Sequence, residues 1–264
     1  NTGRTVQTAP LVRRADGGYE VDFDRFERAI TPRTRVFVLC NPHNPVGRVF
    51  TKPELERMAE ICLRHDVVIC SDEIHEDFVY SGFTHVPIAS IAPEIAAKTV
   101  TLFSPSKSFN IAGFQLAVAH ASDASLLERL RRATSGLVPH RPGLFDIVAA
   151  QAAYQEGGEW LAGCVRYLEG NRDLLVDFVE SRLPGVEMFR PEGTYLAWLD
   201  CRKAGLGEPP GEFFLREAKV ALNEGTIFGK ESGEDFVRLN FGCPRSILLE
   251  ALERMSVALE RKVS

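Results

Sequence analysis

Short, strongly apolar runs alternate with segments of helical periodicity in the first half of the sequence, and this alternation limits the folds the chain can adopt. Each run is rich in β-branched residues and ends at polar or turn-forming residues, so it predicts a buried strand. The runs lie at residues 35–40, 66–70, 99–103 and 116–120. Helices are expected at 51–64, where Thr51 and Glu54 form a capping box, and at 122–133. The alternation predicts a three-layer α/β domain with a mostly parallel sheet.

The second half of the sequence mixes helices and strands in a different order. Helices are expected at 146–155, 159–181, 212–219 and 244–261, and strands at 194–199 and 236–240. Such a mixture is typical of a smaller α+β domain. We therefore expect a large domain at residues 1–160 and a small C-terminal domain at residues 161–264.

Composition and charge exclude several classes of protein. The 264 residues are 45% hydrophobic and 25% charged, as is ordinary for a soluble globular protein. The net charge of −5 argues against a nucleic-acid partner. No apolar run is long enough to span a bilayer and no signal-peptide pattern opens the sequence, so no membrane association is expected. The six cysteines form no C-x-x-C pair, which predicts reduced thiols in a cytoplasmic protein.

Unusual polar sequences follow three of the predicted strands. They are NPHNPVGR at 41–48, SDEIHED at 71–77 and SPSKSFN at 104–110. In open α/β sheets, ligands bind beyond the carboxyl ends of the strands. If the strands are parallel, the three sequences converge on one rim, which predicts the functional site.

Lys107 is the most informative residue of this rim. Its amine lies among the hydroxyls of Ser104, Ser106 and Ser108, just after an apolar strand. Hydroxyls and an amine at a strand end suit a bound phosphate and a carbonyl, a combination that indicates a Schiff base with pyridoxal phosphate (PLP). The alternative is a solvated lysine in a loop.

Asn44 and Asp72 each allow two interpretations. Asn44 lies between two prolines and just before Gly47, so its amide is either part of a rigid turn or a fixed hydrogen-bond donor to a cofactor oxygen. Asp72 follows a hydrophobic strand, so its carboxylate is expected to be partly desolvated and to seek a cation. That cation is either a protonated pyridine nitrogen or an arginine, and helix capping is a further possibility.

Two other groups are candidate sites. Arg238 has apolar neighbours in the predicted strand 236–240, where a substrate carboxylate would satisfy its guanidinium. The alternative for Arg238 is a solvent-facing position on an edge strand. Glu73, Glu76 and Asp77 with His75 are reminiscent of a metal site, but no second His or Cys cluster lies at ligand spacing, so no metal is expected.

Together these residues resemble a known family. N-P-x-G at 44–47, Asp72, S-x-x-K at 104–107 and Arg238 match, in order, motifs of fold-type I PLP-dependent enzymes of the class I/II aminotransferase group. The resemblance implies that Lys107 forms the Schiff base and that Asp72 pairs with the pyridine nitrogen. It further implies contacts of the cofactor with Asn44, His75, Ser104 and Ser106, and of the substrate α-carboxylate with Arg238.

Within this group the chain is most similar to the cystathionine β-lyase branch, the maltose-regulon-modulator type of carbon–sulfur β-lyase. The matching segments are 41–48, 71–75, 106–113, 192–200 and 238–245. His75 and Gln115 stand where aminotransferases usually carry a tyrosine and a phosphate-binding arginine. The resemblance therefore implies cleavage of L-cystathionine or a related cysteine S-conjugate to pyruvate, ammonia and a thiol.

The resemblance also implies a homodimer acting on a small amino acid, with an aminotransferase or a non-catalytic regulatory or truncated relative as the alternatives. Members of the group carry a substantial segment before the position matched by Asn1. That segment supplies a phosphate-binding loop and an aromatic residue that stacks on the cofactor. Neither is found in this sequence, so we expect a large domain that is incomplete at its N-terminus.

Overall fold

The structure is a computed structural model of the chain that describes residues 3–15, 17–136 and 142–263. The chain divides into two compact units. The first contains residues 1–12, 20–42 and 49–163, and the second contains residues 13–19, 43–48 and 164–264.

This division differs from the expected one at residues 161–163, which fall in the first unit, and in two short segments of the N-terminal half. Residues 13–19 belong to the second unit because Arg13 forms ion pairs with Glu187, at 2.7 Å, and with Asp200. Residues 43–48 belong to it because the carbonyl of Gly47 accepts hydrogen bonds from the backbone of Glu192 and Gly193. Both segments contact residues that are far away in the chain, and the local sequence pattern does not predict such contacts.

A four-stranded sheet organises the first unit, in the order β3-β4-β5-β6. Its strands are β3 (Val36–Cys40), β4 (Val68–Asp72), β5 (Thr99–Phe103) and β6 (Val118–His120). The first three are parallel and β6 is antiparallel to β5. Asp72 pairs with Cys40 on one side and with Leu102 on the other, so the three parallel strands end at one edge.

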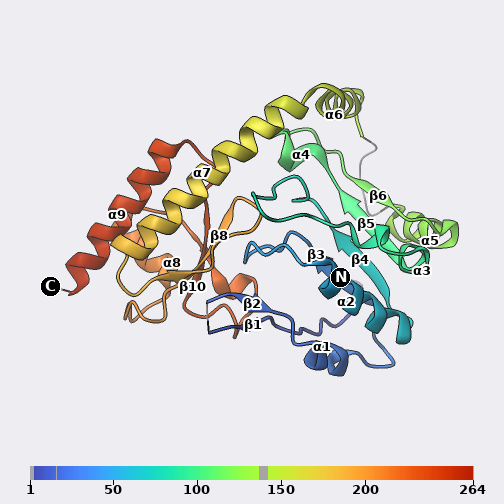
Figure 1. Cartoon of the computed structure of the whole chain (residues 1–264), viewed down its shortest axis with the longest axis horizontal. Coiled ribbons are helices and arrows are strands. Elements are labelled where there is room, and N and C mark those ends of the chain that lie inside the picture. The colour runs from blue at the N-terminus through green and yellow to red at the C-terminus, as the bar shows by residue number, and fades with distance from the viewer. Residues whose placement is uncertain (1–2, 16, 137–141, 264) are drawn as a thin grey trace. The chain divides into compact units, whose positions relative to one another are not determined.

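Helices lie on both faces of this sheet (Figure 1). The helices of this unit are α1 (Phe23–Ala29), α2 (Lys52–Arg64), η1 (Ile88–Ser90), α3 (Pro93–Ala97), α4 (Pro105–Ser108), α5 (Ala124–Thr134), α6 (Leu144–Glu156) and the start of α7 (Gly158–Arg182). Of these, α2 and α5 pack on opposite faces of the sheet. Leu39 and Ile69 pack in one core with Leu55 of α2. Val100 packs on the other face with Leu126 of α5. The capping box predicted for α2 is confirmed.

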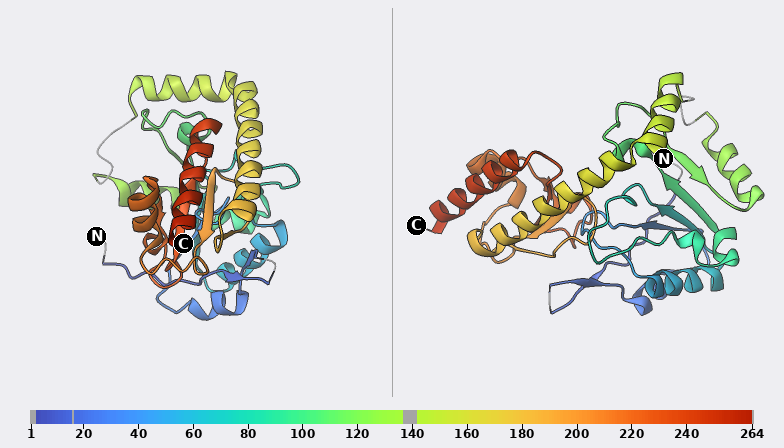
Figure 2. Two further views of the ribbon diagram at one scale, coloured as in Figure 1. Left: turned by 90° about the vertical axis from the view of Figure 1, so that its left-hand side faces the viewer. Right: turned by 45° about the horizontal axis from the view of Figure 1, so that its top comes forward.

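The second unit contains an antiparallel sheet in the order β7-β8-β10-β9. Its strands are β7 (Glu187–Met188), β8 (Leu196–Asp200), β9 (Asn223–Glu224) and β10 (Phe236–Asn240). The part of α7 from Cys164 onward runs beside α9 (Arg245–Val263), and the Ser256 hydroxyl donates to the Arg182 carbonyl between them (Figure 1 and Figure 2). β8 is buried along its whole length, so this sheet has an apolar centre.

Five short elements complete the description. The strands β1 (Val12–Arg13) and β2 (Tyr19–Glu20) form a two-stranded ribbon. The helix expected at 212–219 is a single α turn, α8 (Pro210–Phe213), that continues as the π-helix η2 (Phe214–Ala218) and ends at Lys219 in the left-handed conformation. A 3₁₀ turn, η3 (Gly225–Ile227), follows β9. In the part of the chain that the structure describes, no helix has both the length and the apolar character needed to cross a bilayer.

Candidate active site

The carboxyl edge of the first sheet brings together two of the predicted polar sequences. Asp72 is the last residue of β4 and pairs with Leu102 of β5. Ser104 follows β5 directly and begins the segment that carries Lys107. Because β4 and β5 are parallel, Asp72 and this segment leave the sheet at the same edge, as predicted for this part of the rim.

Lys107 lies in α4, a single helical turn that starts immediately after β5. Ser104 caps this turn: its hydroxyl oxygen accepts a hydrogen bond from the backbone N–H of Ser106 at 3.1 Å. The same hydroxyl donates to the carbonyl oxygen of Leu116 at 2.6 Å. These bonds, with Pro105 in the first turn, fix the backbone that presents Lys107.

The Lys107 side chain itself is exposed. Its amine forms no ion pair or hydrogen bond with any described residue. Two positions further on, the Phe109 ring packs edge-to-face against Tyr154 and stacks on Trp160, with centroid distances of 5.7 and 6.4 Å. The lysine is thus a free amine on an anchored backbone.

The Asp72 carboxylate is half-buried, and few groups of the chain stabilise its negative charge. Its Oδ1 accepts one hydrogen bond, from the backbone N–H of Ile74 at 3.2 Å. No arginine, lysine or histidine among the described residues forms an ion pair with this carboxylate. The alternative, in which an arginine of the chain pairs with Asp72, is therefore not supported by the described residues. The carboxylate is therefore available to an external cation.

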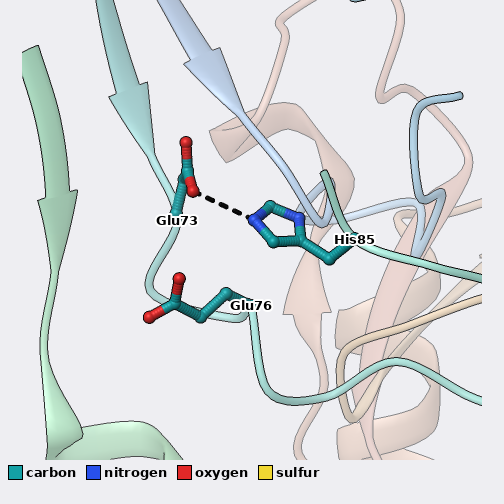
Figure 3. Close-up of side chains that lie close together, drawn as sticks. All are labelled: Glu73, Glu76 and His85. Atoms are coloured by element: carbon teal, nitrogen blue, oxygen red, sulfur yellow. Dashed lines mark hydrogen bonds and ion pairs between the residues drawn. The ribbon is translucent and has the colours of Figure 1, made fainter. Parts of the chain in front are cut away.

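His75 and an acidic group lie just beyond Asp72. His75 is buried, and its carbonyl accepts a hydrogen bond from the backbone of Phe78. Figure 3 shows Glu73 and His85 pointing toward each other with Glu76 beside them, and the candidate ligand atoms of these three residues lie within 4.8 Å of one another. The group includes His85 rather than His75, and Glu73 and His85 are joined by a hydrogen bond of 3.0 Å.

The remaining predicted site residues belong to the second unit. Asn44 lies in a tight turn closed by two backbone hydrogen bonds of 2.7 Å, between His43 and Arg48 and between Gly47 and His43. Gly47 has a φ of +83°, and a Cβ there would lie 2.9 Å from the side chain of Pro191. The turn therefore requires glycine and holds Asn44 rigidly.

Asn44 and Arg238 contact each other directly. Arg238 Nη1 donates to Asn44 Oδ1 at 2.9 Å, and Nη2 donates to Asn223 Oδ1 at 2.8 Å. Because the Asn44 oxygen is used in this way, its Nδ2 group remains a donor without a partner among the described residues.

The Arg238 guanidinium is partly buried and has no carboxylate partner in the described part of the chain. Its Nε is buried and makes no hydrogen bond, and its Cζ lies 4.7 Å from the centroid of the Phe228 ring. Burial lowers the pKa of Arg238. β10 lies between β8 and β9, so the alternative of a solvent-facing position on an edge strand is wrong. Such a guanidinium is suited to bind an anion.

Sequence reasoning missed two residues of these surroundings. Asn223 comes from the two-residue strand β9, opposite Arg238 in the register, and His85 from a loop. Neither has a local pattern that marks it, because each acquires its neighbours only through the tertiary fold.

Comparison with known proteins places these features in context. The chain is 39% identical to cystathionine beta-lyase PatB of Bacillus subtilis (strain 168), over 97% of this chain and 66% of the relative. The structure of cystalysin from Treponema denticola, which contains a pyridoxal 5'-phosphate cofactor, superposes with a TM-score of 0.91 at 34% identity, covering 96% of this chain and 64% of that one. For a PLP-bound C-S lyase from Staphylococcus hominis the TM-score is 0.88 at 34% identity, with coverages of 97% and 66%.

The chain thus spans about two thirds of the length of these relatives. Their structures confirm the predicted fold, an α/β domain with a mostly parallel sheet followed by a smaller α+β domain. A family model described as aminotransferase class I and II matches residues 2–255, which is nearly the whole chain. The chain therefore belongs to the aminotransferase class I and II family.

Proposed function

We propose that the natural protein carrying this chain is a PLP-dependent carbon–sulfur β-lyase. It would convert L-cystathionine, or a related cysteine S-conjugate, and water to pyruvate, ammonia and a thiol. The observation that carries the proposal is the presence, in segments that leave one sheet edge, of the Lys107 amine and the Asp72 carboxylate, neither of which has an oppositely charged partner among the described residues. The similarity to cystathionine β-lyases and C–S lyases supports the choice of reaction.

The residues of the first unit fit PLP. The Lys107 amine is free to bind an aldehyde carbon covalently, and the Asp72 carboxylate lacks the cation that a protonated pyridine nitrogen would provide. When bound, the cofactor supplies an electron sink for the substrate α-carbon. Ser104 remains the proposed phosphate contact and Ser106 a proposed cofactor contact, and their two hydroxyls lie 2.9 Å apart, within hydrogen-bond distance. The buried His75 remains a proposed contact of the ring.

Lys107 has two tasks in this proposal. Its amine would hold the cofactor covalently, and the same amine, when free, would take the proton from the substrate α-carbon. The bond between the β-carbon and sulfur then breaks, and the sulfur leaves with the bonding electrons as a thiolate. Asp72 would hold a proton on the ring nitrogen of the cofactor and so strengthen its action as an electron sink.

The second unit supplies the proposed recognition of the substrate carboxylate. Arg238 is partly desolvated and has no internal counter-ion among the described residues, so an α-carboxylate would bind it with charge-assisted hydrogen bonds. Asn44 would donate from Nδ2 to the ring hydroxyl of the cofactor, the one role its fixed amide orientation leaves open.

A second candidate function is that of an aminotransferase, which the family match favours. It would use the same residues but return a proton to the cofactor carbon instead of expelling a thiolate. The products distinguish the two reactions. The lyase releases pyruvate and a free thiol without an acceptor, whereas the aminotransferase needs a keto-acid acceptor.

We further infer a cytoplasmic homodimer. All six cysteines are free thiols, which is typical of proteins in a reducing compartment and supports the cytoplasmic location. Burial also raises the pKa of the Cys62 thiol to about 12. Light scattering on the purified natural protein tests the oligomeric state, because a dimer has twice the mass of the polypeptide. Cell fractionation tests the location.

The main experiment follows PLP binding and turnover in the natural protein at its full length. We expect visible absorbance on addition of PLP, and then equal amounts of pyruvate and thiol on addition of L-cystathionine. In the Lys107→Ala variant both signals should be lost. Turnover that persists in Lys107→Ala would overturn the assignment, and turnover that requires a keto acid would favour the aminotransferase.

A further inference from the structure

A buried hydrogen-bond network lies behind the strand end that carries Asp72. The Ser71 hydroxyl donates to Glu73 Oε1 at 2.8 Å, and Glu73 Oε2 lies 3.0 Å from His85 Nε2 (Figure 3). His85 Nδ1 lies 3.3 Å from Nδ2 of Asn41. The Glu73 and His85 side chains are only 1% and 9% exposed. The network thus joins the segment after β3 to the segment after β4, away from solvent.

The orientation of the Asn41 amide fixes the direction of every bond in this network. The backbone N–H of Phe50 donates to Asn41 Oδ1 at 3.0 Å, so Nδ2 must be the group that faces His85. An amide nitrogen only donates, so His85 Nδ1 accepts. The ring proton therefore lies on Nε2 and is donated to the carboxylate of Glu73. His85 bridges the two segments as a neutral donor and acceptor.

Asp72 lies between the two residues that this network holds. Side chains alternate along a strand, so Ser71 and Glu73 point to the α2 face of the sheet and Asp72 points to the other. The Asp72 carbonyl accepts from the backbone N–H of Asn41 at 3.0 Å, and the N–H of Glu73 donates to Leu102 at 2.9 Å. These ladder bonds fix the backbone on both sides of Asp72 within the sheet, and the network adds side-chain hydrogen bonds at Ser71 and Glu73 on the face opposite the Asp72 side chain.

We propose that His85 is a positioning residue for Asp72. By joining Asn41 to Glu73 it holds the end of β4 so that the Asp72 carboxylate stays directed at the ring nitrogen of the cofactor. His85 contacts neither substrate nor cofactor in this role and acts only through the strand. The inference rests on the proposed function, and it adds to it a residue that no motif contains.

The experiment is a double-mutant cycle in the natural full-length protein with two readouts, the dissociation constant of PLP from absorbance titration of the apoprotein and the steady-state kinetics of the PLP-loaded protein. In His85→Ala we expect the dissociation constant of PLP to rise about tenfold, because a displaced Asp72 carboxylate pairs less well with the ring nitrogen, and an unchanged dissociation constant would overturn the inference. In His85→Ala we expect kcat for L-cystathionine to fall about tenfold while KM changes less than about twofold, because one buried bridge of hydrogen bonds is lost. In Asp72→Asn the fall is larger. Adding His85→Ala to Asp72→Asn should cause no further loss, since His85 acts through Asp72. A purely structural role predicts that the two losses multiply.

Rescue and a second disruptive variant sharpen the test. His85→Gln can donate and accept as the imidazole does, so it should restore most of kcat. Glu73→Leu removes both acceptor oxygens, so His85 Nε2–H and the Ser71 hydroxyl lose their partner, and this variant should reproduce the kcat loss if His85→Ala does not fold. The control is His65→Ala, which removes another histidine–glutamate pair of 3.0 Å, with Glu27. Both members of that pair are 38% exposed, and kcat should not change.

The outcomes separate this inference from the proposed function. If the wild-type protein takes up no PLP, both are overturned. If the wild-type protein is active and His85→Ala matches it in kcat, or if the His85 and Asp72 losses multiply, the inference alone is overturned. The inference is supported if kcat falls tenfold in His85→Ala, returns in His85→Gln, and shows no further fall when His85→Ala is added to Asp72→Asn.

Discussion

Lys107 and Arg238 are both cations without a carboxylate partner among the described residues, yet the structure holds them in opposite ways. The Lys107 amine is exposed and makes no hydrogen bond to any residue that the structure describes, while Ser104 caps the helical turn that carries it. The Arg238 guanidinium is partly buried and is held by two amide oxygens, those of Asn44 and Asn223. One charge is free to move on a fixed backbone, and the other is fixed itself.

The difference matches the chemistry proposed for each. An amine that first binds a carbonyl and then moves a proton must change position during the reaction. A guanidinium that recognises a carboxylate gains from being immobilised beforehand, because the entropy of ordering it is not lost on binding. The neutral amide partners matter as well, since they orient Arg238 without neutralising it. The two cations should therefore respond differently when their side chains are exchanged.

The largest effect is expected for Lys107→Arg. Arginine keeps the positive charge, but its guanidinium stays protonated and can neither form the covalent link nor act as a base. We expect kcat to fall by at least about 10³-fold, within the range typical of a lost acid–base group with its nucleophile. The measurement is the rate of pyruvate release, with visible absorbance as a check on cofactor attachment. A loss below tenfold would mean that Lys107 serves only as a charge.

Arg238→Lys also keeps the charge, but here we expect partial function. A lysine ammonium binds a carboxylate at one point and loses the planar fork, so KM for the amino acid should rise about tenfold. Arg238→Ala should raise KM about 100-fold or more, as is typical when one partner of a buried charge pair is removed. Steady-state kinetics with L-cystathionine measure both. If Arg238→Ala lowered kcat with KM unchanged, carboxylate recognition would be the wrong role.

The strands and site residues that could be predicted are those that the local sequence pattern indicates. β5 and β10 lie where the apolar runs placed them, and Asp72 and Lys107 stand out because each comes at or just after such a run. β4 is displaced by two residues from 66–70 because Asp66 takes a left-handed φ of +53° and the ladder continues to Asp72. Asp72 is thus in the strand rather than after it.

The parts that could not be predicted depend on residues far apart in the chain. Asn44 and Arg238 are separated by 194 positions, so no spacing rule joins them. Asn44 belongs to the second unit, because the turn around Gly47 packs on residues 191–193. His85 lies in a loop, and only the fold brings it to Glu73. The local sequence pattern identifies reactive side chains at strand ends, but it does not identify the distant residues that orient them.

Gly47→Ala tests the rigidity on the Arg238 side. The alanine would have to adopt a φ of +83°, and its Cβ would lie 2.9 Å from Pro191. We expect a loss of about 1–3 kcal/mol in the free energy of unfolding. Because the same turn holds Asn44 against Arg238, KM should rise as well. Denaturant unfolding and steady-state kinetics test this together. Gly82→Ala is the control for stability, since Gly82 also has a positive φ but a Cβ added there would meet no described atom within 4 Å.

The smallest effect is expected at Asn223, and it bears most directly on the comparison. Asn223→Ala removes one neutral hydrogen bond, worth about 0.5–1.5 kcal/mol, so KM should rise about threefold to tenfold. Asn223→Asp keeps the shape and gives Arg238 the internal counter-ion that it lacks among the described residues. The aspartate would compete with the substrate carboxylate, so KM should rise more than in Asn223→Ala although a hydrogen bond is retained. If Asn223→Asp instead bound substrate as well as the wild type, the absence of a counter-ion would have no part in recognition, and Arg238 would differ from Lys107 only in its burial.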